Sequence, residues 1–205
     1  MFKPKIAIID YGMGNLFSIY NACLLLNTDP EITSDPDMIK TADAVIFPGV
    51  GAFPIAMHNL RELNLVHVIK DVIKCGKPFL GICLGFQLLF SNSKEFNDCE
   101  GLNVFSGQVF SLKGIRKRVP HIGWEKIFCN KKSFSPYLDN KDFYFVHSFY
   151  VEPKNKDIIN SYFLEGEKKI CASIIYENVF ATQFHPEKSG KQGIKLLKCF
   201  LNNMR

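Results

Sequence analysis

Lys77-Pro-Phe-Leu-Gly-Ile-Cys-Leu-Gly-Phe-Gln-Leu-Leu-Phe90 joins an apolar strand to an apolar helix through a single cysteine. Its hydrophobic pattern predicts a buried strand over residues 77–82 and a helix from Leu84 to about Phe90. Gly81-Ile-Cys-Leu-Gly85 matches the nucleophile-elbow pattern G-x-S-x-G, with cysteine in place of serine. Glycines relieve the crowding around a strained strand-to-helix turn. The free N–H groups at the helix start favour a thiolate, and the Leu84 N–H is the one placed for an oxyanion.

The chain upstream contains the same strand–loop–helix unit twice. The predicted elements are a strand over 5–10, a helix from the N-cap Asn15 to about Leu26, a strand over 42–47 and a helical stretch over 52–74 broken near Asn64. This repetition predicts a mostly parallel sheet with helices on both faces. Because ligands bind at the carboxyl ends of such strands, we expect the loops 10–15, 48–51 and 83–87 to meet at one edge.

The C-terminal half of the chain has a different pattern. Short segments with aromatic and β-branched residues predict additional antiparallel or mixed strands near 104–112, 125–129, 142–150, 170–176 and 179–183. The last segment, 190–202, places Ile194, Leu197, Phe200 and Leu201 on one face, which predicts an amphipathic helix. The chain has no evident linker or repeat, so we expect a single α/β domain over residues 1–205.

Composition and charge exclude several classes of protein. The 205 residues are 47% apolar and 22% charged, an ordinary globular composition. The net charge is +5, but its densest run, Lys113–Arg118, is too short for a nucleic-acid footprint. No apolar run approaches the roughly 20 residues of a membrane span, and no signal-peptide pattern is present, so we expect a cytoplasmic protein. Seven scattered cysteines without a CxxC pair predict neither a zinc site nor a disulfide framework.

A cysteine nucleophile needs a base, and the base needs an orienting group. His185 stands in Gln183-Phe-His-Pro-Glu187, directly after the predicted strand 179–183. Glu187 lies two residues further on, where extended backbone would project both side chains to one side. His58 and His67 fall in the helical stretch and are expected to be solvated or partly buried. Taken alone, the elbow pattern is also compatible with a buried structural cysteine, and His185 with an ordinary loop histidine. The presence of both in one chain favours a catalytic role.

Six motifs spread over nearly the whole chain resemble a known family. Gly81-Ile-Cys-Leu-Gly-Phe-Gln87, Pro48-Gly-Val-Gly51 and Gln183-Phe-His-Pro-Glu-Lys-Ser189 are similar to the motifs of triad-type (class I) glutamine amidotransferases. Ile9-Asp-Tyr-Gly-Met-Gly-Asn15, Val119-Pro-His-Ile-Gly-Trp124 and Phe143-Tyr-Phe-Val-His-Ser148 narrow the resemblance to the glutaminase subunits of imidazole glycerol phosphate synthase in histidine biosynthesis. The resemblance implies a flavodoxin-like fold and hydrolysis of glutamine to glutamate and ammonia through a cysteine thioester, with no metal or organic cofactor.

The resemblance also implies a role for individual residues. Cys83 would be the nucleophile, His185 would carry the proton, and Glu187 would orient the imidazole. The backbone N–H groups of Val50 and Leu84 would form the oxyanion hole, an arrangement that could require the 48–51 loop to reorient. The implied glutamine-binding residues are Gly49, Gly51, Gln87, His147, Ser148 and Phe149.

A partner protein is implied as well. Family members pass ammonia to a (β/α)8 cyclase subunit, with which they form a heterodimer that makes imidazole glycerol phosphate and aminoimidazole carboxamide ribotide. The chain is too short to contain such a synthase in addition to the amidotransferase. In family members, some residues lie near the partner interface and the gate through which ammonia passes to the partner. The matching residues of this chain are Asn15, Trp124, Tyr144 and Lys188. Neither nucleic acid nor membrane is an expected partner.

Three positions depart from the family pattern. Phe86 replaces the usual methionine, an apolar exchange, whereas Phe17 and Glu125 stand where a basic residue and an asparagine are common. Because of Phe17 and Glu125, an alternative function remains: a paralogous glutaminase that supplies ammonia to a cyclase-like partner in surface-sugar biosynthesis. A non-catalytic subunit on the same scaffold would be expected to lose a member of the catalytic group. A cysteine protease with the same elbow would lack the His-Pro-Glu arrangement.

Overall fold

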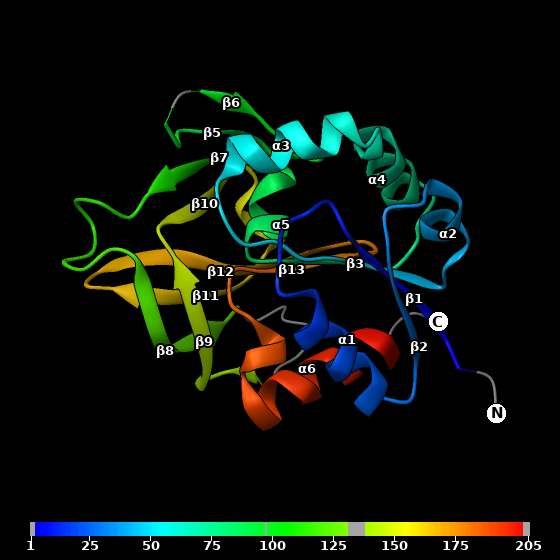
Figure 1. The fold of residues 1–205 in the computed structure, drawn as a ribbon. Helices are drawn as coiled ribbons and strands as arrows, with labels where there is room; N and C mark the ends of the chain where they lie inside the picture. The colour runs from blue at the N-terminus through cyan, green and yellow to red at the C-terminus, as the bar shows by residue number, and fades with distance from the viewer. Residues whose placement is uncertain (1–2, 97, 131–137, 203–205) are drawn as a thin grey trace.

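The computed structural model describes residues 3–96, 98–130 and 138–202 (Figure 1). The strands are β1 (Lys5–Ile9), β2 (Asp29–Thr33), β3 (Ala44–Phe47), β4 (Phe79–Ile82), β5 (Phe90–Ser93), β6 (Cys99–Glu100), β7 (Phe105–Ser111), β8 (His121–Cys129), β9 (Lys141–His147), β10 (Phe149–Pro153), β11 (Ile159–Glu165), β12 (Lys168–Tyr176) and β13 (Val179–Thr182). The helices are α1 (Leu16–Leu25), α2 (Pro36–Thr41), α3 (Phe53–Glu62), α4 (Leu65–Lys74), α5 (Leu84–Leu88) and α6 (Gly190–Asn202), with 3₁₀ turns η2 (Lys156–Ile158) and η3 (Pro186–Lys188).

A nine-stranded sheet with the order β2-β1-β3-β4-β13-β12-β11-β8-β9 runs through the molecule. Its first five strands are parallel, and the remaining four add by antiparallel pairing. The prediction of a parallel sheet with an added antiparallel portion is therefore confirmed. The Tyr11 hydroxyl donates to the Pro48 carbonyl, and the Leu84 N–H donates to the Gly49 carbonyl, so the three predicted loops meet at one edge.

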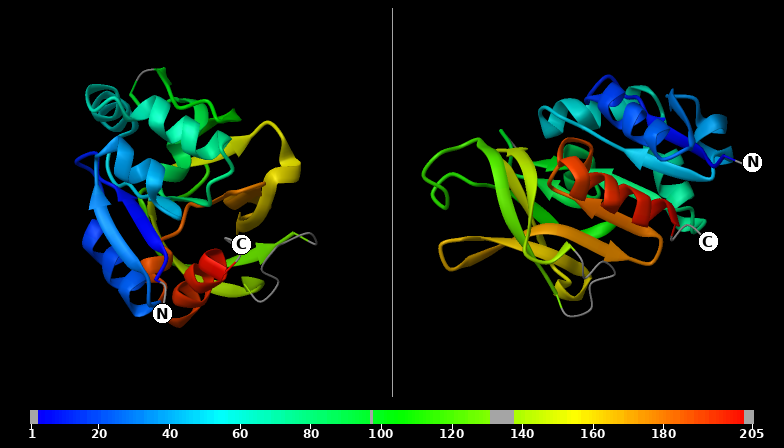
Figure 2. Two further views of the ribbon diagram at one scale, coloured as in Figure 1. Left: turned by 90° about the vertical axis from the view of Figure 1, so that its right-hand side faces the viewer. Right: turned by 90° about the horizontal axis from the view of Figure 1, so that it is seen from below.

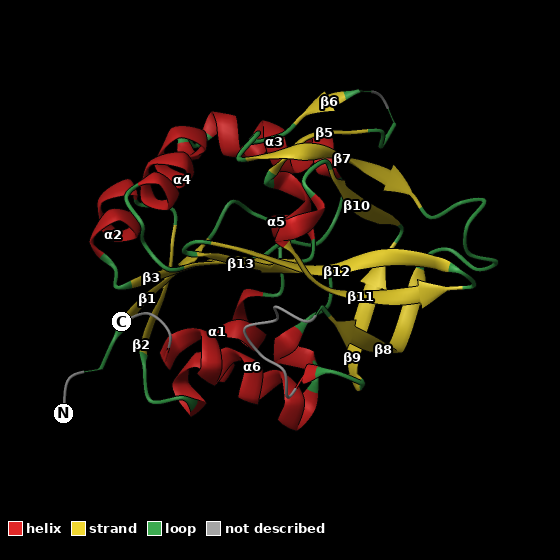
Figure 3. Ribbon diagram, turned by 180° about the vertical axis from the view of Figure 1, so that it is seen from behind, coloured by secondary structure: helices red, strands yellow, loops and turns green. Residues whose placement is uncertain are grey.

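Two helical layers cover opposite faces of the parallel half. In β1, Ala7 and Ile9 pack in the core that contains α2, α3, α4 and α5, whereas Ile6 and Ile8 pack in the core that contains α1 and α6. This alternation follows from the two-residue period of a strand, and it explains why strands covered on both faces are continuously apolar. Figure 3 shows both layers. Seen from below, the β8–β9 end of the sheet lies across the molecule from β1 and β2 (Figure 2).

A second sheet, in the order β10-β7-β5-β6, was not expected from the sequence. The helix predicted to reach Phe90 ends at Leu88, because the following backbone pairs with a later segment. The Leu88 carbonyl accepts from Leu102 N–H, and the Leu89 carbonyl accepts from Phe105 N–H. The segment predicted as one strand over 142–150 is two strands, β9 and β10, which belong to different sheets on either side of Ser148.

Several boundary predictions are confirmed or corrected. Asn64 adopts a left-handed conformation between α3 and α4, which is the predicted break. The closing helix α6 spans Gly190–Asn202 and buries Leu197 and Phe200. Asn15 precedes α1, but its side chain makes no capping hydrogen bond, so the predicted cap is wrong in that respect. Among the described residues, no helix is long and apolar enough to cross a membrane, and no cluster of His, Cys, Asp and Glu is arranged to hold a metal ion.

Candidate active site

The turn between β4 and α5 holds Cys83 in a strained conformation, with φ 55° and ψ −107°. A side chain at position 85 could not coexist with this turn, because a Cβ on Gly85 would lie 1.9 Å from the carbonyl oxygen of Phe47. A Cβ on Gly81 would lie 3.1 Å from the Ala181 Cβ. Both flanking positions are therefore too crowded for a larger side chain, which is the reason for glycine that we expected from the sequence. The sulfur lies at the carboxyl end of β4, as expected for a ligand site in a parallel sheet.

His185 and Glu187 form a buried pair behind the elbow. The imidazole Nδ1 lies 2.8 Å from Glu187 Oε1, and the two side chains are only 3% and 1% exposed. Because a carboxylate accepts, Nδ1 carries the hydrogen and Nε2 is the basic nitrogen. His185 Nε2 is buried and has no hydrogen-bond partner among the described residues. Glu187 reaches the imidazole from the turn η3, and not along the extended backbone that was expected from the sequence.

The electrostatic surroundings of His185 favour its charged form. Burial lowers the pKa of the imidazole, but Cys83 and the Glu187 carboxylate more than offset burial and raise the pKa of His185 to about 10. A histidine that is protonated at neutral pH beside a cysteine stabilises the thiolate, the reactive form of the nucleophile. The structure thus brings the three residues predicted as a catalytic group into one buried cluster.

Backbone contacts hold the His185 turn against β9. The His185 N–H donates to the Tyr144 carbonyl at 2.9 Å, and the Tyr144 N–H donates to the Ser189 hydroxyl at 3.0 Å. The same hydroxyl donates to the His185 carbonyl at 2.6 Å. Both polar groups of the Tyr144 backbone therefore hold the histidine turn, which fixes the imidazole relative to the sheet.

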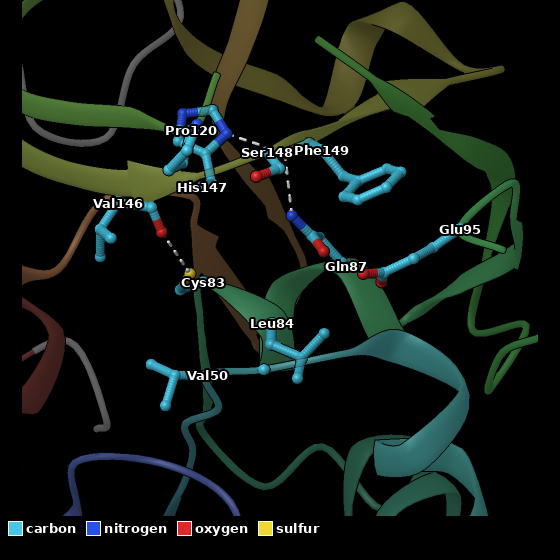
Figure 4. Close-up of a pocket in the computed structure, with 11 residues that line it drawn as sticks. Val50, Cys83, Leu84, Gln87, Glu95, Pro120, Val146, His147, Ser148 and Phe149 are labelled. Atoms are coloured by element: carbon cyan, nitrogen blue, oxygen red, sulfur yellow. Dashed lines mark hydrogen bonds between the residues drawn. The ribbon is translucent and has the colours of Figure 1, made fainter. Parts of the chain in front are cut away.

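A cavity of about 230 Å³ opens in front of Cys83 (Figure 4). Five of the six residues predicted to bind glutamine line it: Gly51, Gln87, His147, Ser148 and Phe149. Gly49 is the exception. It is not among the lining residues, and an added Cβ at this position would be 2.1 Å from the Tyr11 hydroxyl. The lining also includes Val50, Leu84, Glu95, Pro120 and Val146.

Glu95, the one carboxylate among the described residues that line the cavity, was not predicted from the sequence. Its Oε2 accepts a 2.8 Å hydrogen bond from the Phe53 N–H. Burial raises the pKa of the Glu95 carboxyl, and the Phe53 hydrogen bond offsets part of that rise. No local motif marks this residue, because it reaches the cavity only through the second sheet, which was itself not predicted.

Two buried histidines support the far wall of the cavity. His147 Nδ1 lies 2.7 Å from the Phe149 carbonyl, and His147 Nε2 lies 3.2 Å from His121 Nδ1. A carbonyl only accepts, so His147 carries its hydrogen on Nδ1 and accepts through Nε2 from His121. Burial lowers the pKa of His147 to about 3 and that of His121 to about 4, with the positive charge of Arg116 also lowering both values. These lowered pKa values favour the neutral form of both rings near pH 7, against the Glu125 carboxylate that lies 3.6 Å from His121 Nε2.

One of the two expected oxyanion donors is occupied. The Leu84 N–H donates to the Gly49 carbonyl at 3.2 Å. The carbonyl and N–H of a trans peptide point in opposite directions, so rotation of the Gly49–Val50 peptide would free Leu84 and turn the Val50 N–H toward the cavity. Gly51 has φ +115°, a conformation that favours glycine at the end of this loop.

The residues expected at the partner interface surround the His185 turn. Trp124 and Tyr144 pair across β8 and β9, with ring centroids 6.0 Å apart, and the Trp124 side chain is 57% exposed. Asn15 and Lys188 are exposed, and the turn that carries Lys188 contacts both α1 and β9. Ile122, which was not predicted at this interface, is 61% exposed on the same side of β8 as Trp124.

Phe17 and Glu125, the two departures from the family pattern that bear on the partner, differ in their surroundings. Phe17 is 75% exposed near the start of α1. Glu125 points to the opposite side of β8 from Trp124, where its carboxylate pairs with Arg116. Arg116 also pairs with Glu165. Glu125 therefore belongs to a partly exposed ion-pair cluster and does not share the exposed aromatic surface.

The chain belongs to the class-I glutamine amidotransferase family, whose model matches residues 7–204. Within this family its sequence groups with the imidazole glycerol phosphate synthase subunit HisH of several bacteria. It is 48% identical to that of Caldanaerobacter subterraneus subsp. tengcongensis, over 95% of this chain and 96% of the relative. It is 44% identical to that of Lactococcus lactis, over 98% and 99%.

Solved structures share the fold at much lower sequence identity. PurLQS from Thermotoga maritima aligns with a TM-score of 0.78 and 18% identity over all of both chains. A glutamine amidotransferase from the same organism aligns with a TM-score of 0.67 and 15% identity, over 100% of this chain and 99% of that one. These likenesses agree with the flavodoxin-like α/β fold expected from the sequence.

Proposed function

We propose that the chain is the glutaminase subunit of an imidazole glycerol phosphate synthase, with Cys83, His185 and Glu187 as its catalytic triad. The observation that carries the proposal is the buried His185–Glu187 pair at 2.8 Å, next to a cysteine on a strained elbow. The family match over residues 7–204 supports a single amidotransferase domain. The cytoplasm stays the predicted location.

In the first half-reaction the Cys83 thiolate attacks the side-chain amide carbon of glutamine. The carbonyl oxygen becomes an oxyanion, which the N–H groups of Val50 and Leu84 bind once the Gly49–Val50 peptide has rotated. His185 gives its Nε2 proton to the amide nitrogen as the carbon–nitrogen bond breaks. Ammonia leaves, and a γ-glutamyl thioester remains on Cys83.

In the second half-reaction water hydrolyses the thioester. His185 is now neutral and takes a proton from the attacking water. The tetrahedral intermediate collapses, the carbon–sulfur bond breaks, and the sulfur leaves as a thiolate. Glutamate is released and the imidazolium–thiolate pair is restored. Glu187 stays ionised throughout, because its role is to hold the Nδ1 hydrogen and stabilise the imidazolium.

The cavity has groups suited to both ends of the substrate. The Glu95 carboxylate would bind the α-ammonium group of glutamine, and Gln87 contributes an amide next to it. The backbone from His147 to Phe149 offers further hydrogen-bonding groups along one wall. Gly51 allows the substrate to approach the loop closely. The oxyanion donors, and not the cavity wall, would then distinguish the transition state from bound glutamine.

The released ammonia would pass to a (β/α)8 cyclase subunit, which would use it to make imidazole glycerol phosphate and aminoimidazole carboxamide ribotide. The exposed Trp124, Asn15 and Lys188 would contact this partner, together with the half-buried Tyr144 and the exposed Ile122. The relatives named imidazole glycerol phosphate synthase subunit support the histidine pathway over the surface-sugar alternative. Two departures from the family pattern, Glu125 and Phe17, favoured that alternative. The carboxylate of Glu125 pairs with Arg116 and so does not face the exposed aromatic surface, whereas Phe17 is exposed.

The direct test is an assay of glutamate formed from glutamine by the purified chain. It is run alone, with a histidine-pathway cyclase subunit, and with that cyclase and its nucleotide substrate. Stimulation by the cyclase supports both the chemistry and the partner. Glutaminase activity that the cyclase does not raise would reassign the partner, and a folded chain with no activity under any condition would contradict the catalytic assignment.

A further inference from the structure

Gln183 lies directly after β13, and its side chain is fully buried. Its side-chain amide contacts a polar group at each end. The amide oxygen accepts a 3.0 Å hydrogen bond from Gln87 Nε2, and the amide nitrogen lies 3.7 Å from Cys83 Sγ. A buried amide with a partner at each end is held in one orientation.

A main-chain carbonyl fixes which end of the Gln183 amide faces the sulfur. Gln87 Nε2 also donates to the Phe149 carbonyl at 3.0 Å, a contact drawn in Figure 4. A carbonyl oxygen can only accept, so the nitrogen of Gln87 must face Phe149. That nitrogen also faces Gln183, which must therefore present its oxygen to Gln87. The nitrogen of Gln183 is then turned toward Cys83 and can only donate.

The sulfur needs such a donor only when it is ionised. As a thiol, Cys83 donates to the Val146 carbonyl, 3.7 Å away. As a thiolate it has no hydrogen to donate, and the carbonyl no longer stabilises it. The neighbouring Tyr11 hydroxyl is committed to the Pro48 carbonyl at 2.9 Å. Gln183 is therefore a neutral N–H donor already directed at the sulfur.

The titratable groups around the sulfur come from several elements. His185 and its partner Glu187 approach from the turn after β13. Tyr11 approaches from the loop after β1, and Cys83 contributes to the raised pKa of its hydroxyl, although burial contributes more. His147 and Glu95 stand further along the cavity wall. A hydrogen bond from Gln183 acts on the sulfur independently of these charges because the amide does not titrate.

We propose that Gln183 is a further catalytic residue, whose amide N–H binds the Cys83 thiolate while its oxygen holds Gln87 in the orientation that faces glutamine. Both hydrogens of Gln87 Nε2 are used by Phe149 and Gln183, which leaves the oxygen of Gln87 for the substrate ammonium group. This inference deepens the proposed function, on which its catalytic meaning rests.

The donor acts at two points in the reaction. It favours the resting thiolate, and it stabilises the same sulfur as the leaving group when water has added to the thioester and the carbon–sulfur bond breaks. During the thioester stage the sulfur carries no charge, so the hydrogen bond is weak. No oxidant, metal or further reactant is needed, because the only proton carrier in each half-reaction is His185.

The test measures how the rate of alkylation of Cys83 by iodoacetamide depends on pH in the full chain, with the Cys83 peptide followed by mass spectrometry. Gln183→Met keeps the length of the side chain and removes both polar ends. We expect the midpoint pH of alkylation to rise by about one unit or more, the strength of a hydrogen bond to a charged group. The exposed Cys75 is an internal reference in the same sample. Gln108→Met, on β7, is the matched control.

A folded Gln183→Met chain with an unchanged midpoint would overturn the proposal. If this variant does not fold, nuclear magnetic resonance of the wild-type chain decides. One Gln183 side-chain amide proton must move downfield with the same midpoint as the alkylation of Cys83, and an amide that does not respond overturns the proposal. Alkylation requires no glutamine hydrolysis. A chain that shows the expected shift but no glutaminase activity would therefore contradict the proposed function alone.

Discussion

The backbone N–H of Leu84 donates a 3.2 Å hydrogen bond to the carbonyl oxygen of Gly49. The Gly49–Val50 peptide therefore occupies one donor of the proposed oxyanion hole and turns the other away. Val50 is 38% exposed beside the cavity, where a bound partner could contact it. A partner that binds the rotated peptide more tightly would shift the population toward the active form. We expect the chain alone to hydrolyse glutamine slowly.

Removing the Val50 N–H tests the oxyanion assignment. Val50→Pro should lower the partner-stimulated kcat for glutamine hydrolysis by about 10²–10³-fold, the usual effect of losing one oxyanion donor. Val50→Ala keeps the N–H and is the matched control, so its kcat should stay near that of the wild type. Steady-state kinetics with the cyclase present measures both. Equal loss in the two variants would indicate that the Val50 side chain matters and not its N–H.

Replacing the triad tests the order of its contributions. Cys83→Ala should lower glutamine hydrolysis by about 10⁵-fold or more, and Glu187→Gln by about 10²–10⁴-fold, because the carboxylate orients the base and does not react. Circular dichroism and partner binding should be unchanged in Cys83→Ala. Glutamate release that survives in this variant would eliminate Cys83 as the nucleophile.

Glu95 should act on substrate binding. Glu95→Gln keeps an oxygen for the Phe53 N–H but removes the charge that would bind the ammonium group of glutamine. We expect the KM for glutamine to rise by about 10–100-fold, with kcat changed much less, since charge-assisted hydrogen bonds are of that strength. Glu100→Gln on β6 is the control, because this side chain is exposed. An unchanged KM would exclude Glu95 from the substrate site.

The neutral histidine pair should make the fold sensitive to acid. His147 and His121 have pKa values of about 3 and about 4, below the 6.5 of an exposed histidine, so the unfolded chain binds their protons more readily. Their contribution is complete above about pH 6.5 and is lost as the pH falls toward 4 for His121 and toward 3 for His147.

Urea denaturation at a series of pH values measures this effect. Protonation of one such histidine on unfolding should make the free energy of unfolding at about pH 5 lower than at neutral pH by about 2 kcal/mol. His121→Asn keeps a donor for His147 but cannot titrate, so its stability should depend less on pH. Identical pH dependence in the two chains would contradict the neutral state of His121.

The catalytic group could be predicted from the sequence because each member lies next to a strong local signal. Cys83 stands between two glycines, and His185 and Glu187 directly follow an apolar strand. Glu95 and Gln183 could not be assigned roles in the same way. Glu95 reaches the cavity through long-range pairing of β5 with β7, and the role of Gln183 depends on contacts with two residues about 100 positions away.

The fold likewise has a part that could be predicted from local sequence patterns and a part that could not. Helices and strands of the N-terminal half repeat a local pattern, and their parallel order follows from it. The turn at Ser148, where the chain passes from β9 in one sheet to β10 in the other, leaves no such pattern, because aromatic and apolar residues flank Ser148 on both sides with no glycine or proline between the two strands. The helix after Cys83 ends early for a similar reason: its backbone after Leu88 bonds to a segment beyond residue 101.

We propose that this chain releases ammonia from glutamine for a cyclase partner. The most direct measurement is the rate of glutamate release from glutamine by the chain alone and with a histidine-pathway cyclase subunit and its nucleotide substrate. We expect slow release by the chain alone and strong stimulation by the complex, which Cys83→Ala abolishes. A well-folded wild-type chain that releases no glutamate in the presence of the cyclase and its substrate would contradict this proposal.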